Sequence, residues 1–464
     1  MKILFTHGYF LSEDPKELQI MRPYVPLGIL YISSFLEKHG YTNEVFDSTF
    51  STLDILKEKL LKTTPDVVAI YTNLMTKLNV LKVIKFVRSE ASLSHTKIIL
   101  GGPEVRNHAE NFLNYGADYI VIGEGEETTL ELVKALEIVD ASTPLSMAIS
   151  NIKGLAYLEN EKVITTPERA LIKDINNLPF PAREKIDFKP YLSGWKTHHG
   201  YSMMSVNTMR GCPYTCKWCS RAVYGGTYRR RSAQLVAQEM KFIKQTYNPD
   251  MIWFVDDVFT IHHKWLKEFA EEVKKKDAVI PYEIISRADR LNEEVIKTLK
   301  DSGCFRVWVG AESGSQKIID AMDRRVDVMQ TREMIRLAKQ HGLEAGTFIM
   351  LGYPGETKHD IKETIEHLVQ SNPSQYTITI AYPIKGTELY NEVKNEFLDQ
   401  QLEWETSTDR DIDFKRTHPK QYYQYAIQWV MNEVYLKTKN KNLLKIPYLK
   451  LKSLKYQLQM EMSK

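Results

Sequence analysis

Short apolar runs alternate with amphipathic helical patterns along the first 140 residues of the chain. Runs that are apolar throughout are typical of parallel strands whose sheet is covered by helices on both faces. Five such strand–helix units predict a doubly wound, Rossmann-like α/β domain. The expected strands span 2–7, 44–47, 67–72, 97–102 and 119–124.

Doubly wound sheets bind their ligands beyond the carboxyl ends of the strands. Two of the expected strands end there in glycine-rich turns, whose backbone amides are free to meet a ligand. The candidate binding residues in these turns are Gly101, Gly102, Gly123, Glu124 and Gly125.

A second series of strands begins at about residue 201. Its apolar runs are separated by helical patterns such as those at 232–245 and 293–303. Six strand–helix units predict a partial (β/α)6 barrel of the TIM type, with its chemistry at the carboxyl ends of the strands. The expected strands span 203–208, 251–256, 281–286, 306–311, 345–351 and 376–381.

The rest of the chain connects and completes these two units. Residues 141–200 contain a hairpin pattern that turns near Glu159 and Asn160, followed by a proline-rich crossing. We therefore expect a doubly wound domain at 1–140, a linker with a hairpin at 141–200, the barrel at 201–394 and a helical region at 395–464.

Composition excludes several classes of protein. The 464 residues are 43% hydrophobic and 26% charged, which is ordinary for a globular chain. Lys and Arg total 62 and Asp and Glu 59, so no strong overall field attracts nucleic acid. No apolar run approaches the roughly 20 residues of a membrane-spanning helix, and the N-terminus does not resemble a secretion signal. These features predict a cytoplasmic protein.

Three of the four cysteines form a C-x3-C-x2-C loop directly after the first expected barrel strand. Cys212, Cys216 and Cys219 therefore belong to the active side of the barrel. A structural zinc ion needs four ligands, and Cys304 is the one thiol left to complete such a site. Three thiolates on one short loop instead suit a 4Fe–4S cluster that keeps one iron open. We favour the cluster, and we expect Cys304 to be a small buried hydrophobic residue.

This loop resembles the signature of the radical S-adenosylmethionine (SAM) superfamily. The preceding domain, which ends in IVIGEGEETTLELVKAL, resembles the cobalamin-binding domain of one subgroup, that of the anaerobic magnesium-protoporphyrin IX monomethyl ester cyclases and class B methylases. The resemblance covers about residues 1–390. It implies three cofactors: a 4Fe–4S cluster, SAM bound to the open iron, and cobalamin. Reduction would then release a 5′-deoxyadenosyl radical, with flavodoxin or ferredoxin as a suitable electron donor.

The resemblance also implies contacts to SAM, most of them at its methionine end. Trp218 matches the aromatic residue whose backbone meets the adenine, and Asp256 and Asp257 match the position that binds the amino group. The alternative for Asp257 is an N-cap of the next helix. Arg287 matches a position for the methionine carboxylate, with an ion pair to Asp289 as its alternative.

Two later strand ends match the positions that hold the nucleoside part of SAM. Glu312 and Ser313 match the ribose-binding position after the fourth barrel strand. The segment GTFIMLGYPGE matches the motif of the fifth strand that supports the adenine, and its candidate residues are Gly346, Gly352 and Glu356. The residue that carries out catalysis on the substrate is not identified.

The cobalamin-binding domain departs from the best-known pattern, D-x-H-x-x-G, in which the histidine coordinates cobalt from below. That pattern is absent from residues 1–150. His7 lacks the preceding Asp, and His39 lies at a helix end as an ordinary cap. The resembling subgroup often binds cobalamin without a protein ligand, so we expect binding at the glycine turns. The alternative is a scaffold domain that has lost the cofactor.

Two basic segments leave alternatives open. The run Arg229, Arg230 and Arg231 either faces a cofactor or is a solvated charge run. The C-terminal region carries a series of lysines among leucines, which favours a helix with a solvated lysine face; contact with an anionic membrane is the alternative. These lysines are Lys437, Lys439, Lys441, Lys445, Lys450, Lys452 and Lys455.

The function that follows from the resemblance is hydrogen abstraction from an unactivated carbon, followed by cobalamin-dependent methyl transfer. Ring formation or rearrangement without methyl transfer is the alternative. Sulfur insertion into tRNA is disfavoured because this chain lacks a second cysteine triplet. We expect a small-molecule or hydrophobic substrate and no nucleic acid partner.

Overall fold

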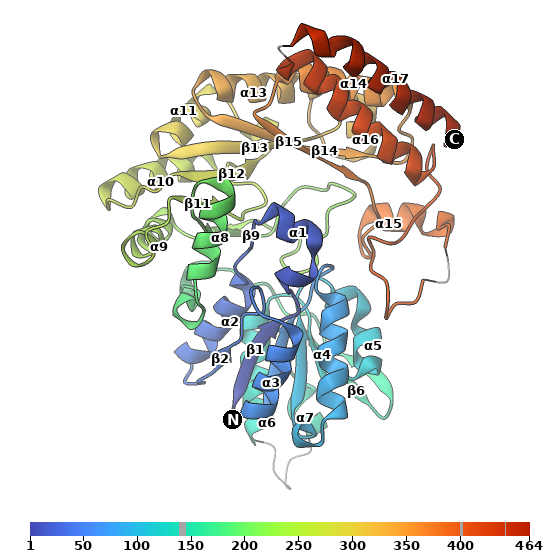
Figure 1. Ribbon diagram of the computed structural model, residues 1–464. Coiled ribbons are helices and arrows are strands. Elements are labelled where there is room, and N and C mark those ends of the chain that lie inside the picture. Colours follow the sequence, from blue (N-terminus) through green and yellow to red (C-terminus); the bar gives the residue numbers. More distant parts are fainter. Residues whose placement is uncertain (139–144, 400–401, 441) are drawn as a thin grey trace.

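The chain folds into two α/β units that lie one above the other (Figure 1). The structure, a computed structural model, describes residues 1–138, 145–399, 402–440 and 442–464. The N-terminal unit occupies the lower half of the view and the barrel unit the upper half, with the C-terminal helices at the top. This arrangement confirms the predicted fold class.

The first unit is built on a seven-stranded sheet in the order β2-β1-β3-β4-β5-β6-β7. Its first five strands are parallel, and β1 and β3 pair in register from Ile3 and Val67 onward. All five parallel strands lie where the sequence predicts them. They are β1 Ile3–His7, β2 Glu44–Val45, β3 Val67–Tyr71, β4 Lys97–Gly101 and β5 Tyr119–Val121.

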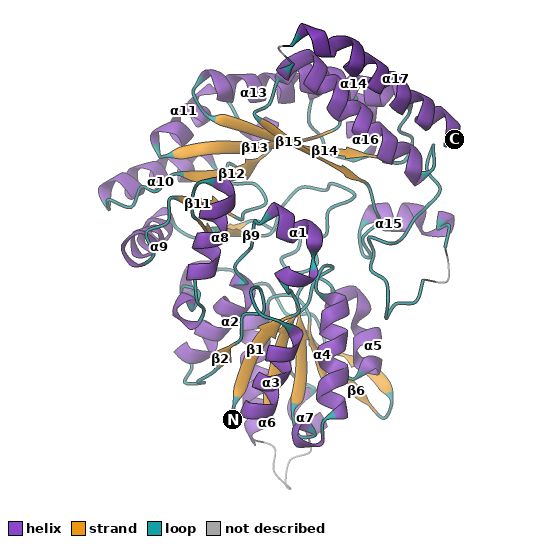
Figure 2. Cartoon of the chain, in the orientation of Figure 1, coloured by secondary structure: helices purple, strands orange, loops and turns teal. Residues whose placement is uncertain are grey.

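Helices cover both faces of this sheet (Figure 2). Successive strand residues point to opposite faces, so Leu4 packs with the helices α3, α4 and α5, whereas Ile3 and Phe5 pack with α2 and α6. Both faces are therefore buried, as the uninterrupted apolar runs require. The helices are α1 Pro15–Ile20, α2 Leu27–Lys38, α3 Leu53–Thr63, α4 Lys77–Ser89, α5 Val105–Tyr115, α6 Gly125–Ile138 and α7 Leu145–Ile149.

The predicted hairpin is present as β6 Leu155–Glu159 and β7 Lys162–Thr165. Asn160 and Glu161 turn the chain with positive φ angles of 49° and 62°. The hairpin pairs antiparallel with β5, so it extends the first sheet as well as leading toward the barrel. The boundary predicted at residues 140–141 lies outside the described residues, and the four-part division of the chain stays a prediction.

The barrel unit has six parallel strands in the order β15-β14-β13-β12-β11-β8. The sheet is open between β8 and β15, which confirms a partial barrel. Each strand lies within two residues of its predicted position. They are β8 Met203–Val206, β11 Met251–Phe254, β12 Tyr282–Ser286, β13 Cys304–Glu312, β14 Glu344–Leu351 and β15 Gln375–Ile380.

Helices surround the outside of this sheet. The C-terminal helix α16 packs its aromatic residues Tyr422, Tyr423 and Trp429 against α14 and β14. No helix within the described ranges is both long and apolar enough to cross a membrane. The helices are α8 Lys189–His199, α9 Ala233–Thr246, α10 His263–Lys275, α11 Glu293–Asp301, α12 Gln316–Ala321, α13 Val328–Gln340, α14 Lys358–Ser371, α15 Glu388–Val393, α16 Lys420–Val434 and α17 Ile446–Met462.

Candidate active site

A cavity of about 940 Å³ lies between the two units. One wall comes from the carboxyl ends of β1, β3, β4 and β5, and the other from the cysteine loop and the ends of β11 and β12. This size is near the upper end of the roughly 300–1,000 Å³ that is usual for small-molecule sites. Eight of the predicted site residues line it: Gly101, Gly102, Gly123, Glu124, Gly125, Cys212, Cys219 and Asp257.

The cysteine loop is held at both ends and in its middle. A short antiparallel pair, β9 (Met209–Arg210) with β10 (Arg229–Arg230), fixes the chain just before Cys212. Near the third cysteine, the Lys217 amide donates to the Met322 carbonyl at 3.1 Å, and the Lys217 carbonyl accepts from the Leu389 amide at 2.9 Å. Cys212 and Cys219 line the cavity, whereas Cys216 is buried and does not.

The spacing of the thiols is unsuited to one zinc ion. The three sulfur atoms do not all lie within 4.8 Å of one another, whereas Zn–S bonds of about 2.3 Å require tetrahedral ligands roughly 3.8 Å apart. Cys304 begins β13 at the opposite, amino end of the barrel, where its thiol donates to the Arg306 carbonyl at 3.4 Å. It is buried, as predicted, and cannot complete a zinc site with the loop.

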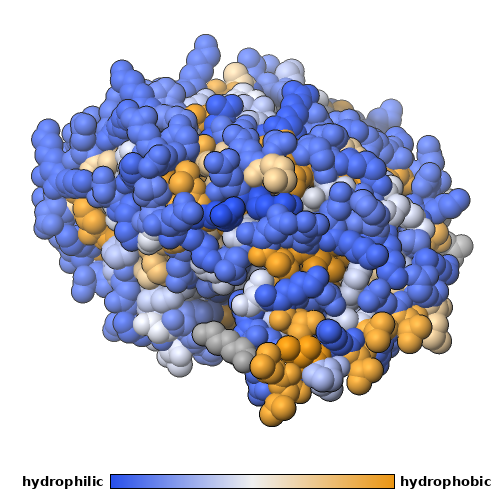
Figure 3. All heavy atoms as spheres, turned by 90° about the horizontal axis from the view of Figure 1, so that it is seen from above, coloured by the Kyte–Doolittle hydropathy of each residue, from blue (hydrophilic) through white to orange (hydrophobic). Residues whose placement is uncertain are grey.

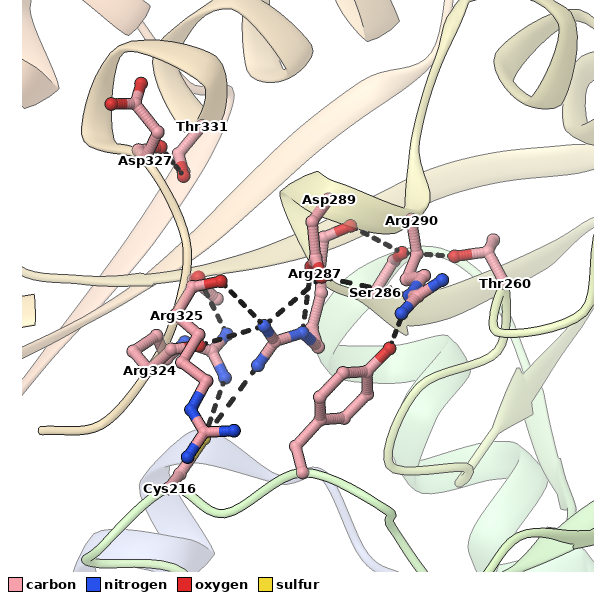
Figure 4. A network of polar contacts seen from close by, with 12 residues as sticks. Cys216, Thr260, Ser286, Arg287, Asp289, Arg290, Arg324, Arg325, Asp327 and Thr331 are labelled. Carbon is pink, nitrogen blue, oxygen red and sulfur yellow. Dashed lines mark hydrogen bonds and ion pairs between the residues drawn. The ribbon is translucent and has the colours of Figure 1, made fainter. Parts of the chain in front are cut away.

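Two arginines converge on the buried cysteine (Figure 4). Arg324 Nη1 lies 3.5 Å and Arg287 Nη1 3.9 Å from the Cys216 sulfur, and the Arg287 guanidinium stacks over the Tyr214 ring at 3.7 Å. Donors of this kind stabilise a thiolate and, in iron–sulfur sites, adjust the reduction potential. The sequence reasoning missed Arg324, because nothing in its spacing places it beside the loop.

The surroundings of Cys212 and Cys219 favour the protonated thiol. Desolvation and the nearby Asp257 charge raise the pKa of Cys219 to about 12 and also raise the pKa of Cys212. A coordinating metal removes the proton from such a thiol outright. The soft donor set and its wide spacing therefore fit a cluster with three protein ligands, which Cys212, Cys216 and Cys219 would hold.

The two neighbouring aspartates have different surroundings. Asp256 is buried and accepts hydrogen bonds from the Thr208 amide at 2.7 Å and from Arg230 Nη2 at 2.9 Å, so its oxygens are already occupied. Asp257 instead opens to the cavity, where desolvation and the Asp256 charge raise its pKa. Of the predicted pair, Asp257 is the carboxylate that a ligand can reach.

Arg287 forms the ion pair with Asp289 that was predicted as the alternative to binding the methionine carboxylate of SAM. Its Nε donates to Asp289 Oδ1 at 2.8 Å, and its Nη2 donates to the Arg324 carbonyl at 2.9 Å. Glu312 lies close by, with Oε1 3.7 Å from Arg324 Nη2. Burial raises the pKa of Glu312, and its φ of 65° is unusual for a residue with a side chain. Strained residues of this kind cluster at functional sites.

Three predicted residues after β13 and β14 serve the local structure. The Ser313 hydroxyl accepts from the Ser315 amide at 3.1 Å and faces Thr364 of α14. Glu356 accepts from the Gly352 amide at 2.6 Å and is fully buried, so its pKa rises to about 8. The Ser313 hydroxyl and the Glu356 carboxylate therefore each stabilise a turn of the backbone.

Gly346 and Trp218 are also placed by packing. A Cβ on Gly346 would lie 2.4 Å from the Trp308 ring, so this glycine makes room for an aromatic side chain near the start of β14, away from the strand's carboxyl end. Trp218 packs against an apolar cluster that includes Tyr353, the second residue after β14. Its role at the adenine of SAM stays a prediction.

Glu124 is the candidate whose observed role differs most. It was expected at the cobalamin tail, but Arg210 Nη1 donates to its Oε1 at 2.8 Å and Arg229 Nη1 to its Oε2 at 2.6 Å. Arg210 also donates to Glu126 Oε1 at 2.5 Å. These buried pairs join the end of β5 to the residue two positions before Cys212, and therefore couple the two units.

The arginine run is not a solvated charge run. Arg229 pairs with Glu124, Arg230 with Asp256, and Arg231 with Glu239 at 3.0 Å, and all three guanidinium groups are largely buried. A run of like charges in a sequence suggests a solvent-exposed surface, because the carboxylates that pair with it lie on other elements, from 8 to 105 residues away.

We expect Arg210→Met to destabilise the protein by about 3–5 kcal/mol, because it leaves the buried Glu126 without its counter-charge and Glu124 with Arg229 alone. Denaturant unfolding of the purified protein measures this change in free energy. The matched control is Lys267→Gln, which removes a 2.6 Å pair to Glu294 between side chains that are 53% and 69% exposed. That control should change stability by less than about 1 kcal/mol. Equal effects of the two substitutions would contradict the coupling role of Arg210.

Two of the glycines on the opposite wall of the cavity are required by packing within the protein. Gly102 has a φ of 112°, and a Cβ there would lie 2.4 Å from the Thr72 carbonyl oxygen. A Cβ on Gly125 would lie 2.6 Å from Ile32. Both residues line the cavity, and their role in binding cobalamin stays a prediction.

His7 is the one histidine among the described residues that line this cavity. Its Nε2 lies 2.9 Å from Asp47 Oδ1, and its Nδ1 accepts from the Tyr9 amide at 3.2 Å. Both ring nitrogens are therefore engaged at the end of β1. His39 lies at the C-terminal cap of α2, as the sequence predicts.

Comparison with known proteins agrees with this geometry. The family model of the Radical SAM superfamily matches residues 206–368, and the family model of the B12 binding domain matches residues 20–133. An uncharacterized methyltransferase of Pyrococcus horikoshii is 30% identical over 401 residues, which cover 85% of this chain and 83% of that protein. Anaerobic magnesium-protoporphyrin IX monomethyl ester cyclase of Rubrivivax gelatinosus is 26% identical over 415 residues, covering 85% and 70%.

Solved structures share the arrangement of both units. The radical SAM methyltransferase TsrM of Kitasatospora setae, with cobalamin and a [4Fe-4S] cluster bound, matches with a TM-score of 0.69 and 17% identity over 85% of this chain and 78% of that one. OxsB, a cobalamin-dependent SAM radical enzyme with aqua-cobalamin bound, matches with a TM-score of 0.74 and 16% identity over 99% and 72%. With the cysteine loop and the glycine-lined sheet edge facing one cavity, this chain belongs to the radical SAM superfamily and is a radical SAM enzyme that carries a B12-binding domain.

Proposed function

We propose that this enzyme replaces a hydrogen on an unactivated carbon of a small or hydrophobic substrate with a methyl group. The observation that carries the proposal is the shared cavity. Cys212 and Cys219 open into it from one side, and the glycine turns of the B12-binding domain open into it from the other. The printed descriptions of relatives as methyltransferases support the same reaction.

When bound, the cluster with SAM supplies a radical that removes hydrogen, and cobalamin supplies the methyl group. The hydrogen taken from the substrate ends in 5′-deoxyadenosine, and a reduced flavodoxin or ferredoxin supplies the electrons. Cys212, Cys216 and Cys219 would hold the cluster. Asp257 is open to receive the amino group of SAM. Arg324 lies beside Cys216, and Glu312 lies beside Arg324, where it would orient the rest of that cofactor.

The proposal is tested without knowledge of the substrate. Anaerobically reconstituted protein is given cobalamin, a reductant and SAM with a deuterated methyl group. The cobalamin is then extracted and analysed by mass spectrometry. We expect the deuterated methyl group on cobalamin and, after addition of a cell extract, on a new product. Cobalamin that stays unlabelled throughout would contradict methyl transfer.

Ring formation without methyl transfer is the second candidate, because protoporphyrin ester cyclases are among the similar proteins. The two reactions differ in the mass of the product. Methylation adds one methylene unit, and oxidative ring closure adds no carbon. In the labelled assay, a product without deuterium that forms together with 5′-deoxyadenosine would favour the cyclase.

We expect bound cob(II)alamin to lack a nitrogen ligand on its lower face. Asp47 and the Tyr9 amide occupy both nitrogens of His7. The electron paramagnetic resonance spectrum of the bound cob(II)alamin should therefore show no coupling to an axial nitrogen, and the His7→Gln variant should give the same spectrum. Nitrogen coupling that disappears in this variant would make His7 a ligand after all.

A further inference from the structure

The C-terminal helix α17 leaves a row of large apolar side chains in solvent. The row begins in the turn before the helix with Leu444, which is 90% exposed, and ends with Met462, which is 87% exposed. Between them lie Tyr448, Leu451, Leu454 and Leu458, all more than half exposed. In the view from above, hydrophobic side chains gather in a band along one edge of the molecule (Figure 3).

This row is separate from the face that α17 uses for folding. Leu449, Ser453 and Met460 are buried against α16, where Asn432 donates to the Leu449 carbonyl at 2.8 Å and to Ser453 Oγ at 2.7 Å. Since each helical residue turns by about 100°, Leu451 and Leu458 fall on the opposite side from these residues. Folding is therefore satisfied without the exposed row.

From Leu444 to Met460 the charged residues beside the row are all lysines, and Glu461 is the acidic residue at its far end. Seven lysines and no acidic residue lie between Glu433 and Glu461. Lys450 and Lys452 flank the row on its two sides by the same helical geometry, and Lys455 lies at its edge. Lys441 lies outside the described residues.

We propose that this face of α17, consisting of the exposed apolar row and its flanking lysines, docks on the surface of an anionic phospholipid bilayer. The helix would lie in the plane of the interface, with the leucines among the upper acyl chains. The lysine stems would extend along the apolar row and place their ammonium groups at the lipid phosphates. This inference does not depend on the proposed reaction.

The lysines favour lipid over a second copy of the chain. A two-fold interface brings the same patch of both copies together. The lysines of one copy would therefore lie against the equally positive patch of the other, and the two patches would repel each other. An anionic bilayer instead neutralises them while it covers the leucines.

The test is flotation of the reconstituted full chain with vesicles. We expect binding to vesicles of equal parts phosphatidylcholine and phosphatidylglycerol, and little binding to phosphatidylcholine alone. Binding should weaken as salt rises, because the lysine term is screened. The Lys450→Gln/Lys455→Gln variant should bind roughly tenfold more weakly. Leu451→Ser/Leu458→Ser should also bind at least about tenfold more weakly, because the variant loses two leucines that the bilayer would bury.

The matched control removes one apolar and one basic residue elsewhere on the barrel unit. Met329→Ser/Lys264→Gln changes side chains on α13 and α10 that are 61% and 81% exposed, and should bind vesicles like the unchanged protein. All variants alter exposed residues, and thermal unfolding checks that each is folded. Sedimentation velocity without lipid reports the oligomeric state.

Three results would overturn the proposal: no flotation with either vesicle, equal flotation with both, or equal loss in the control variant. A dimer that Leu451→Ser/Leu458→Ser converts to a monomer would assign the face to a second copy instead. The readout is binding alone, so failure here leaves the proposed methyl transfer untouched.

Discussion

Replacing Cys212, Cys216 and Cys219 together with alanine should abolish iron binding in anaerobically reconstituted protein. The three thiols lie on the one loop that follows β8 and are soft ligands, and iron in a 4Fe–4S cluster is held by thiolates. Iron and sulfide analysis, with the visible absorbance of the cluster, measures the loss. The unchanged protein should contain one cluster.

The matched control for this result is Cys304→Ala. That thiol lies at the amino end of β13 and is fully enclosed, so its loss should leave the iron content unchanged. A triple variant that keeps a full cluster would refute the assignment, as would loss of iron in the control.

Reduced, reconstituted protein should cleave SAM to 5′-deoxyadenosine even without substrate, and Glu312→Ala should weaken SAM binding while the cluster stays. Glu312 lies 3.7 Å from Arg324, which contacts the buried cluster cysteine, so a cofactor on the cluster comes within its reach. A hydrogen bond to a charged group contributes about 1.5–3 kcal/mol. We therefore expect roughly ten- to hundredfold weaker binding of SAM.

Chromatography of the product and titration of SAM against the cluster spectrum test both parts. Glu344→Ala is the control, since Glu344 begins β14 at the opposite end of the barrel and pairs there with Arg306 at 2.6 Å. It should bind SAM normally. No 5′-deoxyadenosine from the unchanged protein under strict anaerobiosis would count against the radical chemistry itself.

The B12-binding unit and the barrel could both be predicted from local patterns. An apolar run such as 67–72 has one stable environment, between two layers of helices, so its role as a central strand is evident without any contact partner. The cysteine triplet is equally local. Three cysteines lie within eight residues, directly after the first barrel strand. Their spacing indicates the kind of metal site, and their place in the chain indicates the side of the barrel on which it lies.

Residues whose partners are distant in the sequence could not be assigned in this way. Glu124 stands in a glycine turn that suits a ligand, yet Arg210 and Arg229 satisfy its charge from the other unit. Asp256 and Asp257 are adjacent and carry the same functional group. Only the folded structure shows that Asp256 joins a hydrogen-bond network, whereas Asp257 lines the cavity.

The sequence by itself determined the fold class, the positions of the strands along the chain and the candidate ligands of the cluster, because these depend on periodicity and on spacing within one segment. The tertiary structure decided which charged groups remain available to a ligand. A buried charge must be paired, and its partner is selected by the packing of elements that can lie a hundred residues apart, as with Glu124 and Arg229. The same holds for α17, where only the packed structure separates the apolar face that folds from the one that stays exposed.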